Sequence, residues 1–70
     1  MANEYTAVIK QDGDWWIGWI EEIPGVNCQE PSRGQLLETL RLTLAEALDD
    51  NRREALLAAG TGYVTESIRA

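Results

Sequence analysis

The side chains of this 70-residue chain that could perform chemistry are few and scattered. Catalysis requires a nucleophile with a base, a pair of tuned carboxylates, or a metal ion. Histidine, the commonest general base, is absent. The single cysteine, Cys28, has no basic neighbour in the sequence that would favour a thiolate, so a buried structural thiol is a better interpretation than a nucleophile. We therefore expect no catalytic residue and no enzymatic activity.

The carboxylates of the chain form no pattern of metal ligands either. Asp12 and Asp14 flank Gly13 and could bind a cation, but this pattern is more typical of a hairpin turn. The adjacent acids Glu21 and Glu22 indicate solvated surface. One cysteine among scattered carboxylates does not make a zinc site. The sequence therefore predicts no metal and no cofactor.

The charge of the chain bears on its partners. Six lysines and arginines stand against twelve acidic residues, which gives a net charge of −6. Nucleic acids are polyanions that bind mainly through cationic side chains, so DNA or RNA contact is not expected. A basic protein partner fits better, because opposite fields speed encounter. The alternative is that the charge only maintains solubility.

The length of the chain allows one domain, residues 1–70, with one small core. Such a core rarely supplies more than about 3–5 kcal/mol, so small domains depend on disulfides, metals or a partner subunit. One cysteine excludes an internal disulfide. We therefore expect a homo-oligomer, either a dimer or a tetramer. The start has no signal-peptide pattern and no apolar run could span a membrane, which favours a cytoplasmic protein with no membrane contact.

Four segments are expected to form an antiparallel sheet. Tyr5–Lys10 is rich in β-branched and aromatic residues, and an Asp-Gly turn within residues 11–14 joins it to a second strand over Trp15–Glu21. Ile23-Pro24-Gly25 ends this strand, and Val26–Gln29 is read as a third. Tyr63–Ile68 is a plausible short fourth strand.

Residues after Ser32 are expected to form one helix. Ser32 with Gln35 has the form of a capping box, and the helix continues to about Leu48 or beyond. Its apolar stripe consists of Leu36, Leu37, Leu40, Leu44, Ala47 and Leu48. After Asn51 the pattern slips, so the helix either bends or packs against something other than the sheet. The predicted fold is α+β, in the order β-β-β-α-β, with a three- to four-stranded antiparallel sheet on one helix.

The second strand carries apolar residues on both faces, which suggests that both faces are covered. Alternation places Trp15, Ile17 and Trp19 on one face and Trp16, Gly18 and Ile20 on the other. We expect Trp15 and Trp19 beneath the helix, although the assignment could be reversed. The outer face would meet another subunit, a partner or the C-terminal segment. The interface candidates are Trp16, Ile20, Glu21, Glu22, Leu42, Leu56 and Leu57.

The order of these motifs resembles that of HicB-like antitoxins. The resemblance rests on the strand Tyr5-Thr6-Ala7-Val8-Ile9, the aromatic strand Trp15–Trp19, the turn Glu22-Ile23-Pro24-Gly25-Val26, and Ser32 before a leucine-rich helix. It covers about residues 4–48. It implies a partial ribonuclease-H-like fold without catalytic acids. It also implies a bacterial type II antitoxin that blocks a small, basic, HicA-like ribonuclease toxin.

The chain departs from the family pattern in two places. Its helix opens with Gly34-Gln35, where family members more often carry acidic residues. The residues after Gly62 are too few for the DNA-binding domain that many HicB antitoxins add, so no direct DNA binding is expected. Two alternatives to an antitoxin stay open. One is a solitary homo-oligomeric module with another partner or a small ligand, and the other is a degenerate nucleic-acid enzyme with a metal site.

Overall fold

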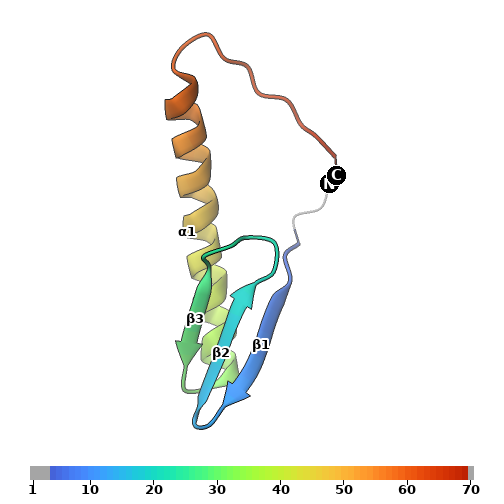
Figure 1. Cartoon of the computed structure of the whole chain (residues 1–70), viewed down its shortest axis with the longest axis vertical. Helices are drawn as coiled ribbons and strands as arrows, with labels where there is room; N and C mark the ends of the chain where they lie inside the picture. The colour runs from blue at the N-terminus through green and yellow to red at the C-terminus, as the bar shows by residue number, and fades with distance from the viewer. Residues whose placement is uncertain (1–3, 70) are drawn as a thin grey trace.

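The computed structural model describes residues 4–69 and contains three strands and one helix (Figure 1). The strands β1 (Ala7–Asp12), β2 (Trp15–Ile20) and β3 (Asn27–Glu30) form one antiparallel sheet in the order β1-β2-β3. The helix α1 (Arg33–Ala59) lies against one face of this sheet. The expected α+β class with an antiparallel sheet and one helix is confirmed.

The hairpin between β1 and β2 turns one residue later than expected. Asp12 belongs to β1 and pairs with Trp15, so Gly13 and Asp14 alone make the turn. Gly13 has φ +63°, and no residue other than glycine has positive φ among those described. Positive φ at the first central position alone is the property of a type II′ turn, which places glycine there. The type I′ conformation that an Asp-Gly centre favours is therefore not formed.

The connection from β2 to β3 contains a tight turn over Ile23–Val26. The N–H of Val26 donates to the carbonyl of Ile23 at 3.4 Å, with Pro24 and Gly25 between them and Gly25 at φ +92°. Proline followed by a glycine of positive φ is the sequence of a type II turn. The turn leads Val26, only 3% exposed, back into the core, where its carbonyl accepts from the N–H of Ile20 at 3.0 Å.

Ser32 caps α1 as the sequence predicts. Its Oγ accepts a hydrogen bond from the backbone N–H of Gln35 at 3.2 Å, and its hydroxyl donates to the side chain of Gln35 at 2.9 Å. The helix continues without a break through Asn51 and ends at Gly60, which has φ +76°. The sequence left two alternatives for the slipped pattern after Asn51, a bend or packing away from the sheet. The slip does not interrupt the helix, since Asn51 lies within α1.

The core lies between the first half of α1 and the sheet. Its fully enclosed members are Leu36 and Leu40 from the helix, with Ile20 and Val26 from the sheet. Ile9, Trp16, Cys28, Leu44 and Ala47 pack around them. A hydrogen bond also joins the helix to the sheet, since the Thr39 hydroxyl donates to the carboxylate of Glu30 in β3 at 2.8 Å.

The second half of α1 extends past the end of the sheet (Figure 1). The 27 residues of the helix span about 40 Å, whereas six-residue strands span only about 20 Å. Between residues 49 and 59, which we call the overhang, every residue is exposed except Leu56, which is half-buried. The chain has a radius of gyration of 15.2 Å, against about 11 Å for a compact chain of this length.

The expected fourth strand over Tyr63–Ile68 is not formed. Residues 60–69 are described by the structure as an exposed segment with no strand or helix, running back from the end of α1 toward β1 (Figure 1). The overhang accounts for the missing strand. Its eleven residues, at about 1.5 Å each, place Gly60 about 16 Å beyond the end of the sheet. The segment uses most of its length in the return and pairs with no strand.

Candidate protein-binding surfaces

The face of the sheet opposite α1, which we call the outer sheet face, is apolar at its centre. Trp15 and Trp19 are 47% and 40% exposed, and Ile17 between them is half-buried. Their cross-strand neighbours complete the face: Val8, Lys10 and Asp12 from β1, and Asn27 and Gln29 from β3. Two indoles left exposed on the same face of the central strand, on either side of Ile17, form the kind of patch that marks an interaction site.

The orientation of β2 is the reverse of the one expected. Trp16 packs against the core, and Ile20 is only 5% exposed within it, so both side chains lie on the helix side of the sheet. Gly18 lies between them on this face, and the Cδ2 atom of Leu36 would be 3.2 Å from a Cβ at Gly18. The helix therefore approaches the sheet closely on the face that contains Gly18. The glycine at this position of β2 could have indicated from the sequence which face the helix covers.

The acidic residues Glu21 and Glu22 follow β2 and are exposed at one end of the sheet. Glu22 accepts a hydrogen bond from the backbone N–H of Thr6 at 2.8 Å, and the N–H of Glu21 donates to the carbonyl of Thr6 at 2.9 Å. The bond from the Thr6 backbone holds the pKa of the Glu22 carboxyl below its ordinary value. Asp12 and Asp14 lie at the opposite end, in the hairpin.

Negative charge is concentrated in the sheet part of the chain. Residues 1–32 contain six of the twelve acidic side chains but only one of the six basic ones, Lys10. Residues 33–59 contain five acidic and four basic side chains, so the helix is nearly neutral. On the outer sheet face Lys10 lies beside Ile17, and acidic residues stand at both ends, with Asp12 and Asp14 at the hairpin and Glu21 and Glu22 at the other end.

The three leucines expected at an interface are not brought together. Leu42 and Leu57 are 51% and 76% exposed, but they lie 15 residues apart along α1, which corresponds to about 22 Å. Leu56 is half-buried near the helix end, where its carbonyl accepts from the N–H of Gly60. Isolated exposed leucines are ordinary on protein surfaces, so these residues form no patch.

A second apolar surface lies between β1 and the neighbouring side of α1. We call it the β1–α1 groove. It arises because α1 packs mainly on β2 and β3 and leaves the inner face of β1 partly open. Arg41 at its rim pairs with Glu38 at 2.6 Å, and this bond holds the pKa of the Glu38 carboxyl below its ordinary value. The groove is lined by Tyr5, Ala7, Ile20, Leu37, Leu40, Arg41 and Leu44.

The sequence placed Leu37 on the core stripe of the helix, and the structure places it at the edge of the core instead. Leu37 remains 36% exposed in the β1–α1 groove, while Leu36 beside it is fully buried. The groove is not visible in the sequence, because its existence depends on which strands the helix covers.

The side chains that could act as nucleophiles or metal ligands do not cluster. Cys28 is half-buried on the inner side of β3, packs against the core, and its thiol lies 3.6 Å from the Thr43 hydroxyl. Asp12 ends β1, and Asp14 lies in the hairpin turn. Within residues 4–69, no three carboxylate, thiol or imidazole side chains come close enough together to hold a metal ion.

No protein-family model matches the chain, and no curated protein or solved structure is significantly similar to it. Among the residues that the structure describes, α1 lacks the apolar character that a bilayer-spanning helix requires.

Proposed function

We propose that this protein is an antitoxin-like binding module that neutralises a small basic ribonuclease toxin, of the HicA-like kind, by protein–protein contact. The observation that supports this most is the outer sheet face, where exposed Trp15 and Trp19 stand within the acidic part of the chain. Tryptophan is the residue type most enriched among those that dominate binding energy.

The charge of this face favours a basic partner. A ribonuclease that binds an RNA backbone carries lysine and arginine around its site. Such a surface would be attracted over a distance by Asp12, Asp14, Glu21 and Glu22, and apolar contact with the two indoles would then hold it. Occupation of its RNA-binding surface would prevent substrate access. In this proposal the toxin performs the chemistry and the chain described here performs none.

The resemblance to HicB-like antitoxins supports the same proposal. The three-stranded antiparallel sheet followed by one helix is compatible with the HicB-like, partial ribonuclease-H-like domain that the resemblance implies. The proposal also requires that a short gene for a basic protein lies beside the gene for this chain.

The test is binding to the product of that adjacent gene, measured by calorimetry with both purified proteins. We expect a stoichiometric complex and loss of the partner's ribonuclease activity on an RNA substrate. Trp15→Ser and Trp19→Ser should each weaken binding by at least about thirty-fold, as expected for anchoring residues. Leu42→Ser and Leu57→Ser, which remove exposed leucines elsewhere, should leave affinity unchanged. Absence of a basic neighbour, or equal effects of all four substitutions, would contradict the proposal.

A second candidate function is a solitary homo-oligomeric module of the same fold with a different partner. The observation that favours it is the β1–α1 groove, an apolar surface separate from the outer sheet face. Self-assembly with no affinity for any basic neighbour would support this alternative.

A further inference from the structure

Two features of this structure are incomplete in complementary ways. The β1–α1 groove is an apolar surface that no other part of residues 4–69 fills, because one helix does not cover three strands. The overhang, residues 49–59 of α1, is a stretch of helix with no sheet to pack on.

We propose that each of these features is completed by a second copy of this chain. The overhang of one copy fills the β1–α1 groove of the other, and the same contact is repeated in reverse. The two α1 helices then lie side by side and antiparallel, related by a two-fold axis. Such an arrangement is closed, because both copies use the same pair of surfaces.

The sequence positions of the groove and the overhang determine the register of this pair. Leu37 begins the groove side of α1, and Ala59 ends the overhang. When Leu37 of one copy lies opposite Ala59 of the other, the axis passes close to Leu48 of both. Leu48 is half-buried in the single chain, at the point where the sheet ends and the overhang begins.

The groove side of α1 continues onto the overhang through Leu48 and Ala55, and the polar residues Asn51 and Arg52 flank this line. Leu37 and Leu44 line the groove, and a helix with 3.6 residues per turn places Leu48 and Ala55 on the same side. In the antiparallel register, Ala55 of the second copy enters the groove near Arg41. Helix pairs approach to about 8–10 Å between axes, with the distance set by the side chains at the contact, so alanine permits the closer values.

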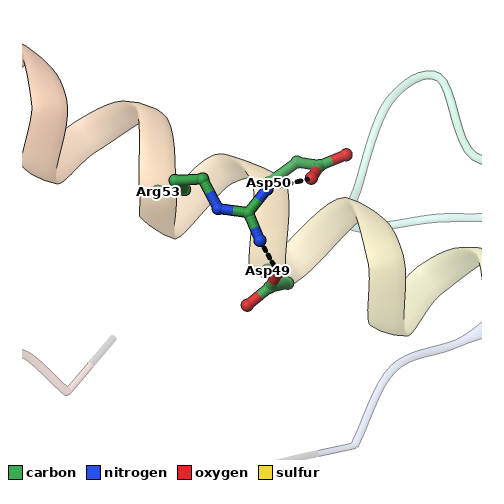
Figure 2. Close-up of polar contacts among 3 residues, drawn as sticks. All are labelled: Asp49, Asp50 and Arg53. Carbon is green, nitrogen blue, oxygen red and sulfur yellow. Dashed lines mark hydrogen bonds and ion pairs between the residues drawn. The ribbon is translucent and has the colours of Figure 1, made fainter.

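The distribution of charge favours association of two copies through the groove and the overhang over association through their outer sheet faces. Two outer sheet faces would bring together the acidic parts of both chains, whereas the helix is nearly neutral. Within the overhang, Arg53 pairs with Asp49 at 2.5 Å and with Asp50 at 3.5 Å (Figure 2). These pairs balance much of the negative charge that one overhang would bring to the other copy.

The area of the contact comes close to that of a specific dimer interface. Residues 37–59 of two antiparallel helices overlap over about 34 Å, with a width of about 10–12 Å. This strip buries on the order of 400 Å² from each helix, and the exposed parts of Tyr5 and Ala7 in the groove add to it. The total therefore approaches the roughly 1,000 Å² that a specific interface requires.

The test measures the molar mass of the purified chain by light scattering over a wide range of concentration. We expect a dimer for the unchanged protein. Leu37→Arg in the groove and Ala55→Arg on the overhang should both give monomers. Leu42→Arg and Leu57→Arg, on other sides of the same helix, should remain dimers. A monomer at all concentrations, or a dimer that persists in both Leu37→Arg and Ala55→Arg, would overturn the proposal.

Cross-linking provides a second measurement that does not depend on disrupting the interface. In a Cys28→Ser background, Leu48→Cys should form a disulfide-linked dimer under mild oxidation, because the two-fold axis passes near this position. Glu46→Cys, on a different side of the helix, should not do so. Failure of Leu48→Cys to cross-link in a dimeric sample would exclude this register. None of these experiments involves the basic partner proposed above, so the two proposals can fail independently.

Discussion

Gly18 of β2 lies so close to Leu36 of α1 that a Cβ atom at Gly18 would be 3.2 Å from the Cδ2 atom of Leu36. The same Cβ would be 2.8 Å from Ile9 Cγ2 and 3.0 Å from the carbonyl oxygen of Val8 in the neighbouring strand. The glycine therefore determines how closely the helix approaches the sheet. It also explains why Leu36 is completely buried in so small a core.

Substitution Gly18→Ala should destabilise the fold. The backbone oxygen of Val8 cannot move away as a flexible side chain would, so β1 or α1 must shift. Overpacking of this kind costs about 1–3 kcal/mol. Gly34→Ala is the matched control, because nothing lies within 4 Å of its Cβ and alanine favours the helix by up to about 1 kcal/mol. In urea unfolding, Gly18→Ala should lower the free energy of unfolding and Gly34→Ala should raise it. Equal changes in the two variants would contradict this account.

The three tryptophans should differ in stability effects and in fluorescence. Trp16 packs against the core, so Trp16→Ala should cost roughly 2–4 kcal/mol, less than for a fully buried ring. Trp15→Ala removes an exposed ring and should cost less than about 1 kcal/mol. In the double variant Trp15→Phe and Trp19→Phe, emission from Trp16 should be shifted to the blue and resist acrylamide quenching. The opposite ranking would mean that Trp15 and Trp19 face the helix after all.

Much of this fold follows from local signals in the sequence. Asp12-Gly13-Asp14, Pro24-Gly25 and the Ser32 cap all fall at boundaries, because turn and cap chemistry is set by neighbouring residues. The stripe of leucines likewise predicted Leu36 and Leu40 as the helix contribution to the core. These features depend on residues within a few positions of each other.

The features that the sequence did not predict depend on contacts between distant segments. Alternation along β2 divides its residues into two sets but does not say which set α1 covers, and the close approach at Gly18 decides it. Tyr63–Ile68 has strand composition, yet it forms no strand because α1 continues to Ala59 and carries the segment away from the sheet. The groove at Leu37 has the same origin, since it reflects the position of the helix across the sheet.

Glu22 should make stability depend on pH in the acidic range. The hydrogen bond from the Thr6 backbone lowers the pKa of Glu22 in the folded chain, relative to the ordinary value of 4.5 expected when unfolded. A lowered folded pKa stabilises the protein above pH 4.5, and this contribution is lost as pH falls through the folded value. Urea midpoints of the unchanged protein and Glu22→Gln should differ at neutral pH and converge in acid. Glu21→Gln, which removes the neighbouring charge but leaves the bond from Thr6 to Glu22 intact, is the matched control and should change the urea midpoint at neutral pH less than Glu22→Gln does.

Association with the proposed basic partner should depend on salt through its rate. The Debye length falls from about 30 Å at 0.01 M to about 8 Å at 0.15 M, so attraction from the acidic part of the chain is screened before contact. We expect the association rate constant to fall over this range while dissociation, which reflects contacts of Trp15 and Trp19, changes little.

Removing two charges near the outer sheet face, by Asp14→Asn with Glu21→Gln, should slow association. Removing two from the overhang, by Asp49→Asn with Asp50→Asn, should have a smaller effect, because the overhang extends past the end of the sheet. Equal slowing by both pairs would mean that total charge, and not its position around the tryptophans, governs encounter.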